Sequence, residues 1–303
     1  MSRIVHGNHP YNVPKDQPMR IGREQVGYFT YPDIKYLGSS DLNTLFISTD
    51  KLTLGYYELA PGAQFSPPDH HPGDECYYIV EGELTEVNCD SGQACQLQKN
   101  EVLLIPHGAP HGGYNFGHKK MKAVFALAPN MVKPGTQSFP TDLEGKWRVL
   151  HGAQEDDFKK YPPQEQKRIL GTIDRLGNWP VLDEENRIAP KYLRVAHEDD
   201  KLCVINGYDH PYLMKFAFST KYMNFGELII PAGGNGRITD RESHKGQTAI
   251  YVESGYLGVI ITETQETFKI HPDEVMYIPE DCEYQMMNYE AEPVHAIFAI
   301  SEL

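Results

Sequence analysis

Short apolar runs separated by turn-forming residues dominate two long stretches of the chain. In the first stretch the runs are Leu52–Ala60, Cys76–Gly82, Glu83–Cys89, Glu101–Pro106 and Met121–Pro129. In the second stretch they are Tyr212–Thr220, Phe225–Gly233, Thr248–Gly255, Leu257–Thr264, Glu274–Asp281 and Ala296–Ser301. Runs of this length bounded by Gly, Pro, Asn or Asp are typical of antiparallel strands in a sandwich or barrel. The pattern therefore predicts an all-β protein.

Two segments interrupt this pattern. Residues 1–45 are polar and contain several Pro and Gly residues, and we expect an arm there with one short strand at Gly27–Thr30. Residues 131–204 form a connector, in which Gln164–Leu176 has apolar residues at helical spacing and predicts about one short helix. The predicted division is an arm at 1–45, a barrel at 46–130, the connector at 131–204 and a second barrel at 205–303.

The second half of the chain repeats the first at an offset of 173 residues. His71–Gly82 aligns with His244–Gly255, and Asn100–Pro106 aligns with Asp273–Pro279. Several independent matches at one offset indicate an internal duplication. We therefore expect two tandem copies of one jelly-roll barrel.

Charge and composition narrow the range of partners. The 303 residues contain 28 Lys and Arg against 42 Asp and Glu, which gives a formal net charge of −14. Such a chain lacks the basic surface that nucleic acid or an acidic membrane requires. No apolar run approaches the roughly 18–20 residues of a membrane span, and the first residues lack the apolar core of a signal peptide. We expect a cytoplasmic protein with a small-molecule substrate.

Candidate metal ligands concentrate between positions 69 and 111. Alternate residues of an extended strand share a face, so Asp69 and His71 point together while His70 points the opposite way. Glu75 follows on the next strand, and His111 can return to the same interior from a third strand. Two imidazoles and two carboxylates suit one divalent first-row metal (Mn, Zn, Fe or Ni) with positions left open for a substrate.

Two of the residues in this region are candidates for catalysis. Tyr77 shares a strand face with Glu75 and could present its phenol to a substrate as an acid or a hydrogen-bond donor. Glu75 could move a proton as well as bind the metal. We therefore consider Glu75 and Tyr77 the candidate catalytic residues.

The spacing of these residues resembles the two signature motifs of the cupin superfamily. The first motif has a Gly, two His one residue apart, a Glu and a later Gly, and Glu75–Gly82 fits its second part. The second motif has Pro-x-Gly, then His, then Asn, and Pro106–Asn115 fits it throughout. Gly62 lies one residue farther upstream than the pattern asks, and Asp69 stands where the family usually has its first His.

The resemblance covers roughly residues 45–130 and 205–303, and it implies a two-domain bicupin. It carries His71, Glu75 and His111 over as metal ligands. Asp69 carries over only as an alternative oxygen ligand, with His70 as its competitor if the strand bulges.

The second copy has changed at the equivalent positions, which are Glu242, His244, Thr248 and Tyr284. Thr248 and Tyr284 are neutral hydroxyls that seldom bind metals, so only two good ligands remain. We expect this barrel to be metal-free, and a second site at Glu242 and His244 remains the alternative.

Three functions stay open. The first is a metal-dependent isomerase, epimerase or lyase that acts on a sugar, keto sugar or hydroxy acid through a metal-stabilised enediolate. The second is an Fe(II)-dependent dioxygenase of a small aromatic or diketone substrate, and the third is a non-catalytic bicupin that binds a small molecule. Because exposed edge strands need cover, we also expect a homodimer.

Overall fold

The computed structural model is built almost entirely of β-strands, which confirms the all-β class. It describes residues 16–29, 41–65, 71, 73–88, 91–129, 192–207, 211–233 and 242–302. Within these ranges the helical content is one 3₁₀ turn, η1 (Glu198–Asp200), and no helix could cross a bilayer. The helix expected at Gln164–Leu176 lies outside the described residues, as do Asp69 and His70.

Ten strands build the first barrel. They are β2 (Gly27–Phe29), β3 (Asp41–Ser48), β4 (Thr53–Leu59), β5 (Asp74–Glu81), β6 (Glu83–Asn88), β7 (Ala94–Gln98), β8 (Val102–Ile105), β9 (His111–Tyr114), β10 (Met121–Ala128) and β11 (Arg194–Ala196). A seven-stranded sheet has the order β11-β8-β5-β10-β4-β3-β2, and a three-stranded sheet has the order β7-β6-β9. Along β7 of the small sheet, side chains alternate between the barrel interior and solvent. The strands β5, β8 and β10 of the large sheet are buried on both faces along most of their length.

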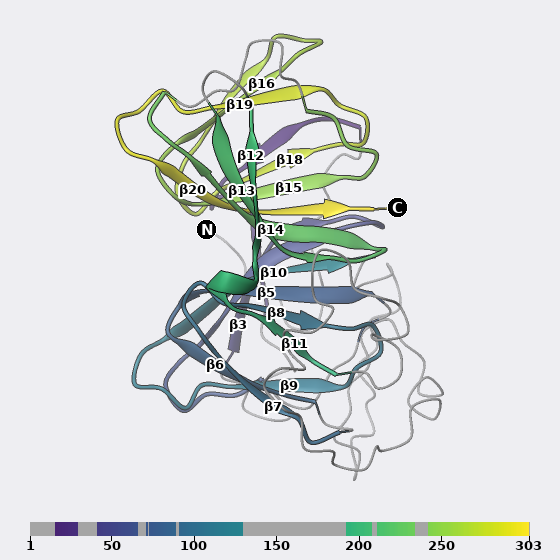
Figure 1. The fold of residues 1–303 in the computed structure, drawn as a ribbon, viewed down its shortest axis with the longest axis vertical. Helices are drawn as coiled ribbons and strands as arrows, with labels where there is room; N and C mark the ends of the chain where they lie inside the picture. Colours follow the sequence, from purple (N-terminus) through teal and green to yellow (C-terminus); the bar gives the residue numbers. More distant parts are fainter. Residues whose placement is uncertain are drawn as a thin grey trace.

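The second barrel has the same construction. Its strands are β1 (Met19–Ile21), β12 (Leu202–Asn206), β13 (Tyr212–Ser219), β14 (Met223–Ile230), β15 (Thr248–Ser254), β16 (Leu257–Ile261), β17 (Thr267–Ile270), β18 (Val275–Ile278), β19 (Tyr284–Met287) and β20 (Val294–Ser301). Its sheets have the orders β1-β18-β15-β20-β14-β13-β12 and β17-β16-β19. Strand for strand this is the order of the first barrel, which confirms two tandem jelly-roll barrels, one above the other in Figure 1.

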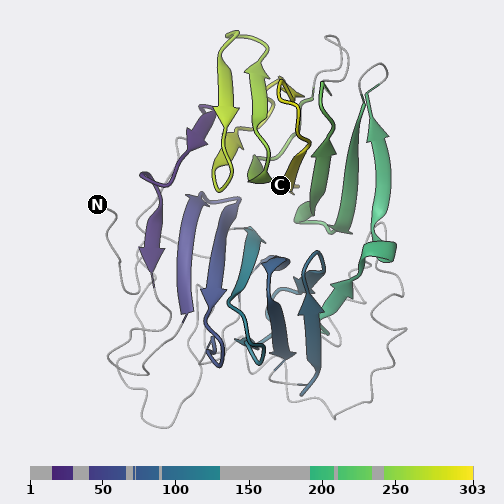
Figure 2. The same cartoon turned by 90° about the vertical axis from the view of Figure 1, so that its left-hand side faces the viewer.

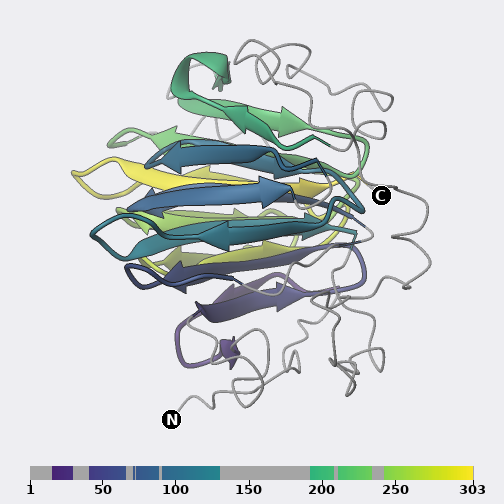
Figure 3. The same ribbon diagram turned by 90° about the horizontal axis from the view of Figure 1, so that it is seen from below.

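The two large sheets pack against each other between the barrels. One continuous apolar core contains Phe46 and Tyr78 from the first half together with Phe225 and Tyr251 from the second. The rings of Phe46 and Tyr251 meet edge to face with their centroids 6.0 Å apart. Figure 3, which looks along the axis that joins the two barrels, shows the strands of both halves running in roughly the same direction. The halves are therefore joined by buried apolar surface, which is the main source of stability in such contacts.

Each half also gives one strand to the sheet of the other. β1 pairs with β18 of the second barrel while β2 pairs with β3 of the first. Reciprocally, β11 pairs with β8 of the first barrel while β12 pairs with β13 of the second. Figure 2 shows the two crossing segments at opposite sides of the molecule. The predicted boundaries at 45/46 and 204/205 fall inside β3 and β12.

The glycine that ends the first sequence motif has a backbone role in both barrels. Gly82 and Gly255 have φ angles of 73° and 76°, a region that disfavours residues with a Cβ. A Cβ at Gly82 would lie 2.4 Å from the carbonyl oxygen of Lys120, and one at Gly255 would lie 2.5 Å from that of Pro293. The turn between β5 and β6, and its counterpart between β15 and β16, therefore require glycine.

Candidate metal centre

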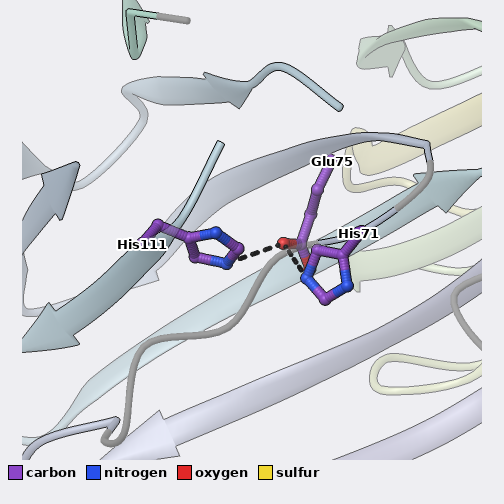
Figure 4. A group of neighbouring side chains, drawn as sticks. All are labelled: His71, Glu75 and His111. Carbon is purple, nitrogen blue, oxygen red and sulfur yellow. Dashed lines mark ion pairs between the residues drawn. The ribbon is translucent and has the colours of Figure 1, made fainter. Parts of the chain in front are cut away.

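Three side chains from separate parts of the first barrel meet in its interior (Figure 4). His71 lies just before β5, Glu75 lies on β5 and His111 begins β9. Glu75 Oε2 lies 3.0 Å from His71 Nε2 and 3.3 Å from His111 Nε2. One ligand atom from each of the three lies within 4.8 Å of the others, and all three side chains are buried. The convergence expected for His71, Glu75 and His111 is therefore present.

The backbone sets the orientation of His111. Its Nδ1 lies 2.9 Å from the carbonyl oxygen of Ala109, which can only accept a hydrogen bond. Nδ1 therefore carries a hydrogen, and Nε2 faces Glu75 Oε2. A histidine that donates one ring nitrogen to a carbonyl and presents the other is the usual arrangement of a metal ligand.

Glu75 is held as an anion. Burial alone would raise its pKa, but His71 and His111 outweigh burial and lower the pKa to about 2. The Tyr77 hydroxyl also donates to Glu75 Oε2 at 3.1 Å. A carboxylate between two imidazole nitrogens fits a divalent first-row ion, because both kinds of donor bind such ions and three protein ligands leave coordination positions open.

Tyr77 has the opposite electrostatic setting. Burial and the charge of Glu75 raise the pKa of its phenol well above the usual value. The phenol therefore stays protonated at neutral pH and acts as a hydrogen-bond donor. Its ring lies against Tyr57, with the centroids 5.0 Å apart. Whether Asp69 or His70 completes the ligand set stays a prediction, because both lie outside the described residues.

The sequence reasoning missed a second group of polar residues inside this barrel. Asp41, Asn43, Tyr57 and Glu86 are all buried, on β3, β4 and β6. Asn43 donates to Asp41 Oδ2 at 2.5 Å. The signal that could have revealed Glu86 is the duplication itself, because the offset of 173 residues places it over an apolar residue of the second copy, Val259.

The equivalent positions of the second barrel hold a different cluster. The Tyr284 hydroxyl donates to Glu242 Oε2 at 3.3 Å, and Asn206 Nδ2 donates to Glu242 Oε1 at 2.5 Å. His244 Nε2 lies 3.5 Å from Glu242 Oε2. In the described part of this barrel no three metal-binding side chains gather, so hydrogen bonds from neutral groups occupy the carboxylate instead.

A pair of jelly-roll barrels with a buried His-Glu-His group in one of them defines a protein that binds or transforms a small molecule. Residues 55–127 match the family described as Cupin domain. Polyketide synthase CurC of Streptomyces cyaneus is 34% identical over 126 residues, which are 40% of this chain and 75% of that protein. The chain belongs to the cupin superfamily.

One further relative is similar in sequence, and one solved structure is similar in fold. Tetracenomycin polyketide synthase protein TcmJ of Streptomyces glaucescens is 33% identical over 82 residues, which are 27% of this chain and about half, 53%, of that protein. The oxalate decarboxylase of Lactobacillus farciminis, solved as a formate complex, matches 96% of this chain and 87% of its own with a TM-score of 0.59. At 12% identity this likeness shows the fold alone, and it extends over both barrels.

Proposed function

We propose that this bicupin is a divalent-metal-dependent enzyme whose first barrel acts on a small, oxygen-rich substrate by isomerase or lyase chemistry. The observation that carries the proposal is the convergence of His71 Nε2 and His111 Nε2 on one oxygen of Glu75 inside the barrel. A buried carboxylate is costly to maintain for stability alone, because several kcal/mol of desolvation must be offset. Metal binding gives these residues a purpose that folding does not require.

The substrate class follows from the donor set. Carboxylate ligands make the site harder and favour substrates that offer oxygen. CurC and TcmJ are polyketide synthase proteins, and polyketide chains carry carbonyl oxygens on alternate carbons, a spacing that suits chelation by one ion. We therefore extend the expected substrates from sugars, keto sugars and hydroxy acids to β-dicarbonyl compounds.

Each residue has a defined part in this scheme. His71, Glu75 and His111 would hold the ion, which supplies a Lewis acid that withdraws electrons from the substrate oxygens. Tyr77 donates to Glu75 and so keeps the carboxylate oriented. Because its own pKa is raised well above the usual value, Tyr77 offers a proton and does not remove one at neutral pH. The catalytic roles of Glu75 and Tyr77 stay proposals.

Elemental analysis tests the metal site. We expect about one divalent ion per chain in the wild type, none in His71→Ala and an unchanged content in His244→Ala, the matched residue of the second barrel. Equal metal in the wild type and His71→Ala would refute the site.

Isotope exchange tests the reaction class. In D₂O, the metal-loaded protein is expected to introduce deuterium next to a carbonyl of hydroxy-acid, keto-sugar or β-dicarbonyl substrates, and a chelator is expected to stop the exchange. Consumption of O₂ on addition of Fe(II) and a diketone, without exchange, would replace this class by a dioxygenase and keep the metal site.

A further inference from the structure

We propose that Glu86 and Tyr57 form a substrate-recognition pair inside the first barrel, which hydrogen-bonds an oxygen of a substrate held at the His71, Glu75 and His111 site. The substrate class is a small keto acid or related compound that carries one oxygen more than the two that chelate the ion. This inference rests on the proposed function and adds a specificity determinant to it.

The strand register places Glu86 on the same face as the metal ligand His111. On the small sheet, Asn88 of β6 lies opposite His111 of β9, and Glu86 lies opposite Gly113. Side chains directly opposite each other point to the same face of a sheet, and so do residues two apart on one strand. Because His111 points into the barrel, Glu86 points into it two residues farther along.

Tyr57 reaches the same place from the other sheet. Gly113 has no side chain, and a Cβ built on it would lie 2.8 Å from Glu86 Oε2 and 3.3 Å from the Tyr57 hydroxyl. The carboxyl and the phenol therefore converge over one glycine of β9. Because Gly113 has no side chain, it leaves the space that the Glu86 carboxyl occupies.

Both groups are buried without the partners that buried polar groups normally have. Glu86 is 1% exposed and Tyr57 is 3% exposed. Among the residues that the structure describes, neither carboxyl oxygen of Glu86 nor the Tyr57 hydroxyl has a hydrogen-bond partner. Since unsatisfied buried polar groups are rare and destabilising, a pair of them in one barrel points to a ligand that satisfies them.

The electrostatic setting makes both groups donors. Burial raises the pKa of Glu86 to about 8, with His111 opposing the rise and Glu75 adding to it. Burial and the charges of Glu86 and Glu75 raise the pKa of Tyr57 well above its usual value. Two neutral O–H groups suit an oxygen that accepts hydrogen bonds, such as a carbonyl or carboxylate oxygen.

The second barrel supplies the comparison that separates function from folding. At the positions equivalent to Tyr57, Glu86 and Gly113 it has Leu228, Val259 and Met286, all buried. Tyr77 is likewise replaced by Ile250. The same fold therefore forms with an apolar interior at these positions. The polar pair accompanies the metal-type donor set and is not required by the barrel.

Two probes that differ by one oxygen test the proposal. Co(II)-loaded protein is titrated with acetoacetate, which can chelate through two oxygens and keep a third, and with acetylacetone, which has only two. Co(II) absorption reports ligation and calorimetry gives the Kd. We expect Glu86→Val and Tyr57→Phe each to weaken acetoacetate binding at least 10-fold and to leave acetylacetone binding and Co(II) content unchanged. Glu86→Gln, which keeps a donor, is expected to retain most of the affinity.

The control variant is Val259→Ala in the second barrel, which is expected to bind both probes like the wild type. Equal affinity of the wild type for the two probes, or wild-type affinity for acetoacetate in Glu86→Val and Tyr57→Phe, would overturn the recognition pair. If both variants instead lost Co(II), the two residues would serve to stabilise the metal site, and the proposed role in substrate recognition would be overturned as well. Failure of the wild type to take up Co(II) would instead remove the proposed function, and the pair with it.

Discussion

The two barrels share a backbone and differ in what fills it. Gly82 and Gly255 make the same turn in the two barrels. Asn115 and Asn288 make equivalent hydrogen bonds to the backbone. Asn115 Nδ2 donates to the carbonyl oxygens of Leu59 and Lys119, and Asn288 Nδ2 donates to those of Ile230 and Glu292. The residues that the fold needs are therefore present in both copies.

Most of the residues proposed for chemistry are present in one copy only. Glu75 and His111 are replaced by Thr248 and Tyr284, and the polar positions around them have become apolar. His71 alone keeps its equivalent, His244. The first barrel thus has the metal-type donor set, whereas the second barrel has the same fold without it. Glu75 and His111, the motif residues that fail to repeat at this offset, are therefore the ones that point to function.

The largest expected effect comes from deleting one ligand in each barrel. His111→Ala is expected to lose the ion and to fall below about 1% of wild-type activity, since even changes in the groups that orient metal ligands cost about 10–100-fold. Tyr284→Ala, at the equivalent position, is expected to keep full metal content. Elemental analysis and the D₂O exchange assay measure both outcomes. Metal loss in Tyr284→Ala as well would erase the difference between the barrels.

Restoring the donor set should make the second barrel resemble the first. Thr248→Glu combined with Tyr284→His places a carboxylate and an imidazole beside His244, with Glu242 already in place. We expect the metal content to rise from about one to about two ions per chain, and His71→Ala in this background to return it to one. A content that stays at one would mean that the barrels differ in more than these two side chains.

Much of the difference between the barrels can be predicted from the sequence, and the features that cannot be predicted have physical reasons. The strand pattern, the duplication and the His71, Glu75 and His111 group were predictable because each rests on local periodicity or motif spacing. Glu86 was not predictable from local alternation, since Glu83–Asn88 mixes polar and apolar residues on both faces, and only its alignment with Val259 at the 173-residue offset singles it out. The exchanged strands β1 and β11 have three residues each, too few for any periodic signal, and their partners lie far away in the chain.

The contact between the barrels carries a further asymmetry. At equivalent positions of β10 and β20 stand Lys122 and His295. Lys122 Nζ donates to Asp273 Oδ1 at 2.6 Å and to the Tyr251 hydroxyl at 2.8 Å. His295 instead lies between Glu227 and Glu253, with its Nε2 2.5 Å from Glu227 Oε2. Glu227 also accepts from Tyr78 of the first barrel at 2.9 Å.

This asymmetry predicts a pH window of stability. Burial opposes protonation of His295, but Glu227 and Glu253 outweigh it and raise the pKa from 6.5 to about 9. The stabilisation is complete below 6.5 and is lost as the pH rises through 9. Burial likewise opposes ionisation of Glu227, but His295 and Lys201 lower its pKa from 4.5 to about 2, so that contribution is complete above 4.5 and is lost on acidification.

Between pH 6.5 and 9 the free energy of unfolding is expected to fall by on the order of 3 kcal/mol, since one pKa unit corresponds to about 1.4 kcal/mol. Urea denaturation at several pH values measures the fall. His295→Gln is expected to abolish it, while His118→Gln, a change of an exposed histidine, is expected to keep it. A fall of equal size in both variants would assign the pH dependence to other groups.

The smallest expected effect on the site concerns the outer edges of the two large sheets. β12 ends its sheet and exposes Leu202, Val204 and Ile205, with Ile205 73% exposed, whereas the equivalent edge strand, β2, reads Gly-Tyr-Phe. An exposed apolar edge strand invites pairing with another chain. We therefore place the proposed homodimer contact at β12.

Ile205→Lys is expected to halve the mass measured by light scattering and to leave metal content and probe binding unchanged, because the metal site lies in the other barrel. A dimer that survives this change, with Tyr28→Lys on β2 dissociating it instead, would move the contact to the opposite edge.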